Sequence, residues 1–147
     1  MVKNTAKYLS YKEAWRRINA ANEQGFYLEV VTICESIISD RLLSYILGVN
    51  KESKANTRTT FGNLIKEWRK LANGKLILKD QSDIGARVDA WRAERNEFIH
   101  GLVKSEPGTA TQDVSSFLER AECAACKGIK LAKAVSAWQR EQKKAQL

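Results

Sequence analysis

The sequence predicts an all-α protein: one domain over residues 1–147, built as an antiparallel bundle of four to five helices with its core at about residues 8–140. Apolar residues recur with the period of an amphipathic helix in five segments. Short connections join these segments, which favours antiparallel packing of neighbouring helices. The 147 residues suffice for one substantial core and leave little room for a second fold.

The first two helices are expected at residues 8–23 and 26–47. Gly25 ends the first of them and Gly48 ends the second. The apolar stripe of residues 26–47 is wide enough to face two neighbours. We therefore expect this segment to be the central helix of the bundle.

Residues 49–60 are polar and lack an apolar period, so they indicate a loop before a third helix at residues 61–71. Thr59 or Thr60 is expected to cap that helix, and Asn73-Gly74 to stop it. Residues 75–79 are too short to assign and suit an extended connector.

The last helix carries its apolar face from Val114 to Trp138. Thr109 and Gln112 have the spacing of a capping box ahead of it. The polar tail after Arg140 is expected to fray.

The helix at residues 83–100 holds the only histidine of the chain, His100, at its end. Ser82 or Asp80 can cap its start, and Gly101 suits a left-handed C-terminal cap. Six apolar residues share one face, which such a helix would bury. They are Ile84, Val88, Trp91, Phe98, Ile99 and Leu102.

Arg95 lies in the middle of this apolar face, where a guanidinium is costly unless it is paired. The pattern leaves three explanations open: an internal ion pair, an edge position whose head reaches water, or a functional cleft at a helix or subunit seam. Glu35 is similarly placed near the middle of the apolar stripe of the central helix. It is either a satisfied or edge carboxylate, or a partner for Arg95 or Arg92.

A polar stripe runs beside the apolar face of the same helix. At roughly 100° per residue, four polar side chains fall within about 80° of one another. They are Asp89, Arg92, Asn96 and His100.

The segment Arg95-Asn-Glu-Phe-Ile-His100 has the form Arg-x4-His, with an asparagine after the arginine and a glycine after the histidine. In this all-α setting it resembles the HEPN superfamily, whose ribonuclease members carry Arg-x4-6-His near a helix end. Residues 83–102 carry the resemblance, and the helical layout extends it to a HEPN-like fold over about residues 8–140.

The resemblance implies a metal-independent endoribonuclease that cleaves RNA by attack of the 2′-hydroxyl, acting as a toxin or in phage defence or stress. HEPN ribonucleases are typically homodimers whose two motifs line one cleft. The expected catalytic residues are Arg95, His100 and Asn96, supported by Asp89, Arg92 and Glu35. An antitoxin or another regulatory protein is a further expected partner.

One position departs from a related pattern. HEPN toxins paired with nucleotidyltransferase antitoxins often have a tyrosine two residues after the histidine, where the antitoxin attaches nucleotides. Leu102 occupies that position here, which argues against control by such a modification.

The residues themselves suit this chemistry. A histidine can accept and donate a proton near neutral pH, and an arginine fork matches the geometry of a phosphate. His100 alternatively is a helix C-terminal histidine that interacts with the helix dipole. We expect no cofactor, and no metal ion among the site residues.

The net charge of +8 and a pI near 9.5 favour an anionic partner, with RNA first in line, although many basic surfaces bind nothing. Between Lys51 and Lys79, eight basic residues face two acidic ones, so this segment is the candidate phosphate-facing surface. Its predicted nucleic-acid-binding residues are Lys51, Lys54, Arg58, Lys66, Arg69 and Lys70. A non-catalytic helical module that binds nucleic acid or a partner protein through this segment is the alternative function.

Three cysteines without a secretory signal favour a reducing, cytoplasmic location. Cys123-Ala-Ala-Cys126 has the spacing of half a zinc site, whose completion would need carboxylates or another chain. We expect these two cysteines to be small apolar packing residues instead. The longest apolar region, residues 26–48, is interrupted by charged residues, so no membrane partner is expected.

Overall fold

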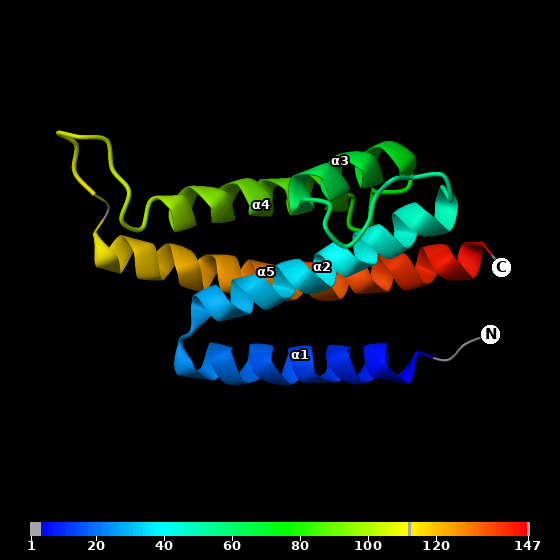
Figure 1. Ribbon diagram of the computed structural model, residues 1–147, viewed down its shortest axis with the longest axis horizontal. Helices are drawn as coiled ribbons and strands as arrows, with labels where there is room; N and C mark the ends of the chain where they lie inside the picture. Colours follow the sequence, from blue (N-terminus) through cyan, green and yellow to red (C-terminus); the bar gives the residue numbers. More distant parts are fainter. Residues whose placement is uncertain (1–3, 112, 147) are drawn as a thin grey trace.

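The computed structural model describes residues 4–111 and 113–146, and these form five α-helices (Figure 1). The helices are α1 (Thr5–Gln24), α2 (Tyr27–Val49), α3 (Phe61–Leu71), α4 (Ile84–His100) and α5 (Val114–Ala145). Within the described ranges the one β-type contact is an isolated antiparallel bridge between Ile77 and Asp83. The prediction of an all-α helical fold is therefore confirmed.

The helices pack around α2 and α5, the pair with the most extensive mutual contact. α3 and α4 cover one side of this pair, and α1 lies against α2 on the other side (Figure 1). α1 and α2 run in opposite directions, as do α4 and α5, which agrees with an antiparallel arrangement. α2 and α5, however, run in the same direction, so neighbouring helices of the bundle are not all antiparallel.

The core contains three of the tryptophans, and each contacts another aromatic ring. Trp68 meets Trp138 edge to face at 5.5 Å between ring centroids, and Trp138 also lies 4.7 Å from Tyr45. Trp91 donates a hydrogen bond from its indole nitrogen to the Ala124 carbonyl, at 2.9 Å. This bond satisfies a buried indole N–H and helps to fix how α4 lies on α5.

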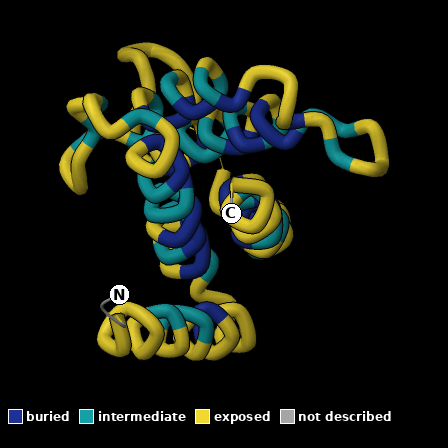
Figure 2. Tube along the Cα trace, turned by 90° about the vertical axis from the view of Figure 1, so that its right-hand side faces the viewer, coloured by how far each residue is buried: buried dark blue, intermediate teal, exposed yellow. Residues whose placement is uncertain are grey.

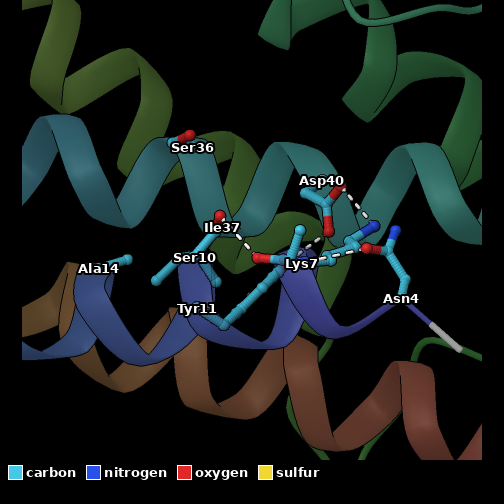
Figure 3. Close-up of a pocket in the computed structure, with 9 residues that line it drawn as sticks. Asn4, Lys7, Ser10, Tyr11, Ala14, Ser36, Ile37 and Asp40 are labelled. Atoms are coloured by element: carbon cyan, nitrogen blue, oxygen red, sulfur yellow. Dashed lines mark hydrogen bonds and ion pairs between the residues drawn. The ribbon is translucent and has the colours of Figure 1, made fainter.

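α1 is the most exposed of the helices, as the yellow tube in Figure 2 shows. It buries only Ile18 and Ala21 fully. Its attachment to α2 depends on Asp40, which accepts a hydrogen bond from the Tyr11 hydroxyl and lies 2.9 Å from the Lys7 ammonium (Figure 3). Burial, followed by the bond to Asp40, raises the pKa of Tyr11, so its hydroxyl stays a hydrogen-bond donor.

Two predictions about the ends of α4 are wrong. Its N-cap is Asp83, whose carboxylate accepts from the Ala86 N–H at 3.0 Å, while Asp80 accepts from Ser82 in the preceding turn. Gly101 at the C-terminus is right-handed, with φ −81°, because the chain continues into another turn stabilised by a bond to the Glu97 carbonyl.

The predicted start and end of the last helix are also corrected. Asp113 caps α5 by accepting from the Ser116 N–H, and Thr109 instead bonds the Glu106 carbonyl. Gln112, the other half of the predicted capping box, lies outside the described residues. α5 continues to Ala145, so the tail expected to fray is helical. Thr60 caps α3 as predicted.

The cysteines also differ from prediction. Cys34 is fully buried, but Cys123 and Cys126 are both exposed. The residues between them, Ala124 and Ala125, are the ones that pack in the core. The prediction that this pair fills apolar space is wrong, because α5 is rotated to place the alanines inward.

A helical glycine at the contact of α4 and α5 allows a test of this packing. A Cβ at Gly128 would lie 2.8 Å from Trp91 Cζ2, whereas one at Gly48 in α2 meets nothing within 4 Å. We expect Gly128→Ala to lower the free energy of unfolding by about 1–3 kcal/mol through overpacking. Gly48→Ala is the matched control, expected to be neutral or to stabilise by up to ~1 kcal/mol. Urea denaturation of both variants measures the difference, and equal effects would contradict this packing.

Candidate functional site

Arg95 lies on the face of α4 that packs into the bundle. Its neighbours one turn away, Trp91 and Phe98, are buried, because the helical repeat places all three on one stripe. Only 20% of the Arg95 side chain is exposed. A guanidinium cannot lose its charge at neutral pH, so it must be paired at this position.

Glu35 of α2 supplies that pairing. Its Oε1 atom lies 2.6 Å from Arg95 Nη1, and its side chain is 23% exposed. Of the explanations that the sequence leaves open, the structure places an internal ion pair at Arg95. The two charges that look misplaced in the sequence thus neutralise each other between the central helix and the motif helix.

The pair does not satisfy every polar atom of its two members. Arg95 Nη2 donates to Asn96 Oδ1 at 2.8 Å, but Arg95 Nε is buried and has no hydrogen-bond partner among the described residues. The contact with Glu35 is close without being a well-aligned hydrogen bond. An unpaired N–H inside the protein costs free energy, so the packing of one chain does not fully satisfy this guanidinium.

Asp89 and Arg92 form a separate cluster at the contact of α3 and α4. Asp89 lies 3.3 Å from Arg69 Nη1 and 3.9 Å from Arg92 Nη1. Arg92 packs against the first turn of α3, where a Cβ on Gly62 would approach its Nη2 to 2.8 Å. Asp89 therefore pairs with Arg69 and Arg92, and Glu35 pairs with Arg95.

His100 ends α4 and is exposed. Its side chain makes no hydrogen bond or ion pair with any residue of the described ranges. It lies five positions after Arg95, which corresponds to about 140° around the helix axis. In one chain, therefore, the imidazole and the guanidinium point to different sides of α4.

Exposed apolar side chains surround the end of α4 that carries His100. Ile99 is 36% exposed and Val103 81%, and on the adjoining start of α5 Val114 and Leu118 are 69% and 50% exposed. These two ends lie side by side (Figure 1), with the Phe98 and Phe117 rings 5.8 Å apart. Trp91 and Phe98 belong to the core, and Leu102 is half-buried.

The predicted phosphate-facing residues occupy the loop before α3 and the outer side of that helix. Five of the six are exposed and have no ion-pair partner in the described part of the chain, whereas Arg69 is half-buried against Asp89. The five are Lys51, Lys54, Arg58, Lys66 and Lys70. The positive charge of this surface is thus largely free to meet an anion.

A polar cavity beside Glu35 was not predicted from the sequence. Its volume is about 450 Å³, and it lies between α2 and the loop at residues 50–60. Thr32, Ser36 and Ser39 line it from α2, and Phe61 from the start of α3. The sequence does contain a pattern that indicates this polar surface, because three hydroxyl residues at positions i, i+4 and i+7 share one face of a helix.

Comparison with family models, with curated proteins and with solved structures finds no match for this chain. Among the described residues, no helix combines the length and apolar character needed to cross a membrane. Within the same ranges, no three His, Cys, Asp or Glu side chains converge as a metal site.

The Glu35–Arg95 pair should contribute measurably to stability. Glu35→Ala leaves the Arg95 charge largely buried and unpaired, so we expect a loss of about 1–3 kcal/mol, between the values for exposed and fully buried pairs. Arg95→Ala should lower the free energy of unfolding less in the Glu35→Ala protein than in the unmodified protein, because the partner charge is already gone. Chemical denaturation of the two single variants and the double variant measures this coupling.

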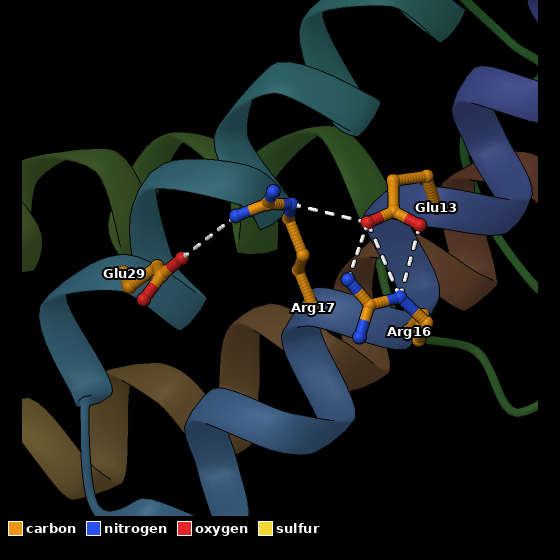
Figure 4. Close-up of polar contacts among 4 residues, drawn as sticks. All are labelled: Glu13, Arg16, Arg17 and Glu29. Atoms are coloured by element: carbon orange, nitrogen blue, oxygen red, sulfur yellow. Dashed lines mark hydrogen bonds and ion pairs between the residues drawn. The ribbon is translucent and has the colours of Figure 1, made fainter.

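The matched control is Glu29→Ala, also in α2. The Glu29 carboxylate is 48% exposed and lies 4.0 Å from Arg17, in a surface group with Glu13 and Arg16 (Figure 4). Its removal should change stability by no more than ~0.5 kcal/mol. Equal effects at Glu35 and Glu29 would show that the Arg95 pair behaves as a surface ion pair.

Proposed function

We propose that this protein is a metal-independent endoribonuclease of the HEPN type, with Arg95 and His100 as its catalytic pair. The observation that carries the proposal is the state of Arg95. Its charge is held in place by Glu35 and Asn96, and 20% of its side chain remains exposed. An arginine positioned in this way is suited to bind a phosphate oxygen.

The chemistry requires no protein nucleophile, because the 2′-hydroxyl of RNA attacks the adjacent phosphodiester. His100 moves the proton of that hydroxyl or of the leaving oxygen, and its exposed position allows RNA to reach it. Arg95 stabilises the charge that develops on the phosphorane oxygens. Asn96, hydrogen-bonded to Arg95, orients the guanidinium, and Glu35 fixes it from the opposite side.

The active form is a symmetric homodimer whose seam includes the end of α4. Arg95 and His100 of one chain point about 140° apart, so a second chain is needed to bring a guanidinium and an imidazole to one phosphate. The exposed Ile99, Val103, Val114 and Leu118 supply apolar area for such a seam. The remaining supporting pair, Asp89 and Arg92, lies one to two turns earlier on α4 and faces the RNA strand.

The free basic residues between Lys51 and Lys70 hold the RNA backbone at a distance from His100, because α3 packs on the first half of α4 through Arg69 and Asp89. We place the protein in the cytoplasm, acting as a toxin or in phage defence or stress, under the control of an antitoxin or another regulatory protein. Leu102 argues that this control does not use nucleotide attachment beside the motif.

A non-catalytic module that binds nucleic acid is the second candidate function. The observation in its favour is the same basic surface, whose five exposed side chains have no ion-pair partner in the described chain. Such a module would bind RNA with a steep dependence on salt and without turnover. Charge reversal at Lys66, Arg69 and Lys70 would then abolish binding, whereas His100→Ala would leave it unchanged.

The experiment that tests the proposal incubates the purified protein with single-stranded RNA in EDTA. We expect cleavage that leaves 2′,3′-cyclic phosphate ends and spares a fully 2′-deoxy substrate of the same sequence. His100→Ala should lower the rate by roughly 10²–10⁴-fold. Arg95→Ala should lower it by about 10²–10³-fold, and Arg95→Lys should restore little, because lysine lacks the planar fork.

Lys143→Ala, in the exposed last turn of α5, is the control for a basic residue outside the site. It should cleave like the unmodified protein. Cleavage that persists at full rate in His100→Ala would refute the catalytic assignment, and salt-sensitive binding without cleavage would establish the module instead.

A further inference from the structure

The Cys123 and Cys126 pair plays no part in the core or in the proposed cleavage chemistry. Both thiols are exposed, whereas burial raises the pKa of the third thiol, Cys34, to about 12. Two exposed thiols three residues apart on one helix face the same side of α5. Their position therefore calls for a role that uses sulfur at the surface.

The helical spacing suits a shared metal ion better than a disulfide. Side chains at i and i+3 on a helix have Cβ atoms about 5–6 Å apart, and a disulfide requires about 3.5–4.5 Å. A zinc ion with Zn–S bonds of about 2.3 Å can bridge the wider gap without opening the helix. Paired ligands at i and i+3 are a known way for helices to hold metal ions.

One chain supplies only half of the ligands that zinc requires. A structural zinc site is tetrahedral with four protein ligands. No third His, Cys, Asp or Glu converges with the two cysteines in the part of the chain that the structure describes. A second copy of the same helix would supply two more thiolates across a two-fold axis.

The charges around the cysteines are arranged for that second copy. The exposed stripe of α5 reads Glu119, Glu122, Cys123, Cys126, Lys127 and Lys130. A two-fold axis between Cys123 and Cys126 pairs two antiparallel α5 helices. It sets Cys123 of one copy against Cys126 of the other, Glu122 against Lys127, and Glu119 against Lys130. All six residues fall within about 140° around the helix.

We propose that Cys123 and Cys126 bind Zn²⁺ together with the same two residues of a second, antiparallel copy of the chain. Binding releases four thiol protons and leaves a Zn(Cys)₄ centre of net charge −2. Lys127 and Lys130 lie beside the two cysteines on the same exposed stripe. These lysines of both copies lower the negative potential around the centre. This site departs from the expectation that the chain binds no metal.

The zinc-bridged contact is independent of the proposed ribonuclease. Lys127 contacts Glu94, which points about 160° away from Asn96 around α4, so the cysteines lie on the opposite flank from the polar stripe that ends in His100. EDTA would dissolve the zinc-bridged dimer and leave the proposed cleavage intact. Failure of one proposal can thus be told apart from failure of the other.

The test titrates the reduced, metal-free full chain with Co²⁺, which reports thiolate ligation by its charge-transfer absorption and tetrahedral geometry by its visible bands. We expect saturation at one ion per two chains, doubling of the mass in light scattering, and displacement by Zn²⁺. Cys123→Ser and Cys126→Ser should each remove the thiolate absorption and the doubling of the mass, and Cys34→Ala should retain them. Zinc should also protect Cys123 and Cys126 of the unmodified protein from alkylation, a readout that needs no variant.

Charge variants test the antiparallel pairing itself. Glu119→Lys should weaken the metal-bound dimer, and adding Lys130→Glu should restore it, because the pairing of these two positions is then reversed on both copies. Absence of thiolate absorption, or one ion bound per monomer, would overturn the shared site. A Glu119→Lys, Lys130→Glu variant that dimerises no better than Glu119→Lys alone would overturn the antiparallel arrangement.

Discussion

The charge of Arg95 is the constraint on which the rest of the arrangement depends. A guanidinium placed on the packing face of α4 must be neutralised, and Glu35 of α2 lies 2.6 Å away to do so. The pair ties the motif helix to the central helix, which itself packs along α5. Replacing both residues by apolar ones would be the simpler way to stabilise a bundle, so the retained charges favour a functional reason for Arg95.

The basic residues of α3, α4 and the loop before α3 fall into two groups. One group is paired with carboxylates, and the other is not. Arg69 and Arg92 are held by Asp89, and Arg95 by Glu35, so these arginines have fixed positions on α3 and α4. The lysines of the preceding loop and of α3 are unpaired within the described chain and extend into solvent. Fixed arginines suit a site that must recognise phosphate geometry, whereas free lysines suit contact with a flexible backbone.

The helices could be predicted from the sequence because each one buries a stripe with a period near 3.6 residues, as Val30, Cys34, Ile38 and Leu42 do in α2. The N-terminal ends of α4 and α5 were harder to predict. Asp83 and Asp113 cap these helices, although nearby residues have side chains that can also cap a helix. Helix rotation was not predictable either, because cysteine and alanine have similar size and polarity. The pairing of Glu35 with Arg95 joins residues far apart in sequence, so the pattern marked both as misplaced without choosing between Arg95 and Arg92 as the partner.

We propose that Arg95 and His100 act together at a cleft built from two chains. The most direct test mixes Arg95→Ala and His100→Ala proteins, each inactive alone, and measures RNA cleavage in EDTA after subunit exchange. Each mixed dimer keeps one intact arginine and one intact histidine, so the account predicts recovery of roughly a quarter of the unmodified activity, as expected for random pairing of subunits with one complete site per mixed dimer. Cleavage no greater than the sum of the two separate variants, with exchange confirmed by mass spectrometry, would contradict the shared cleft.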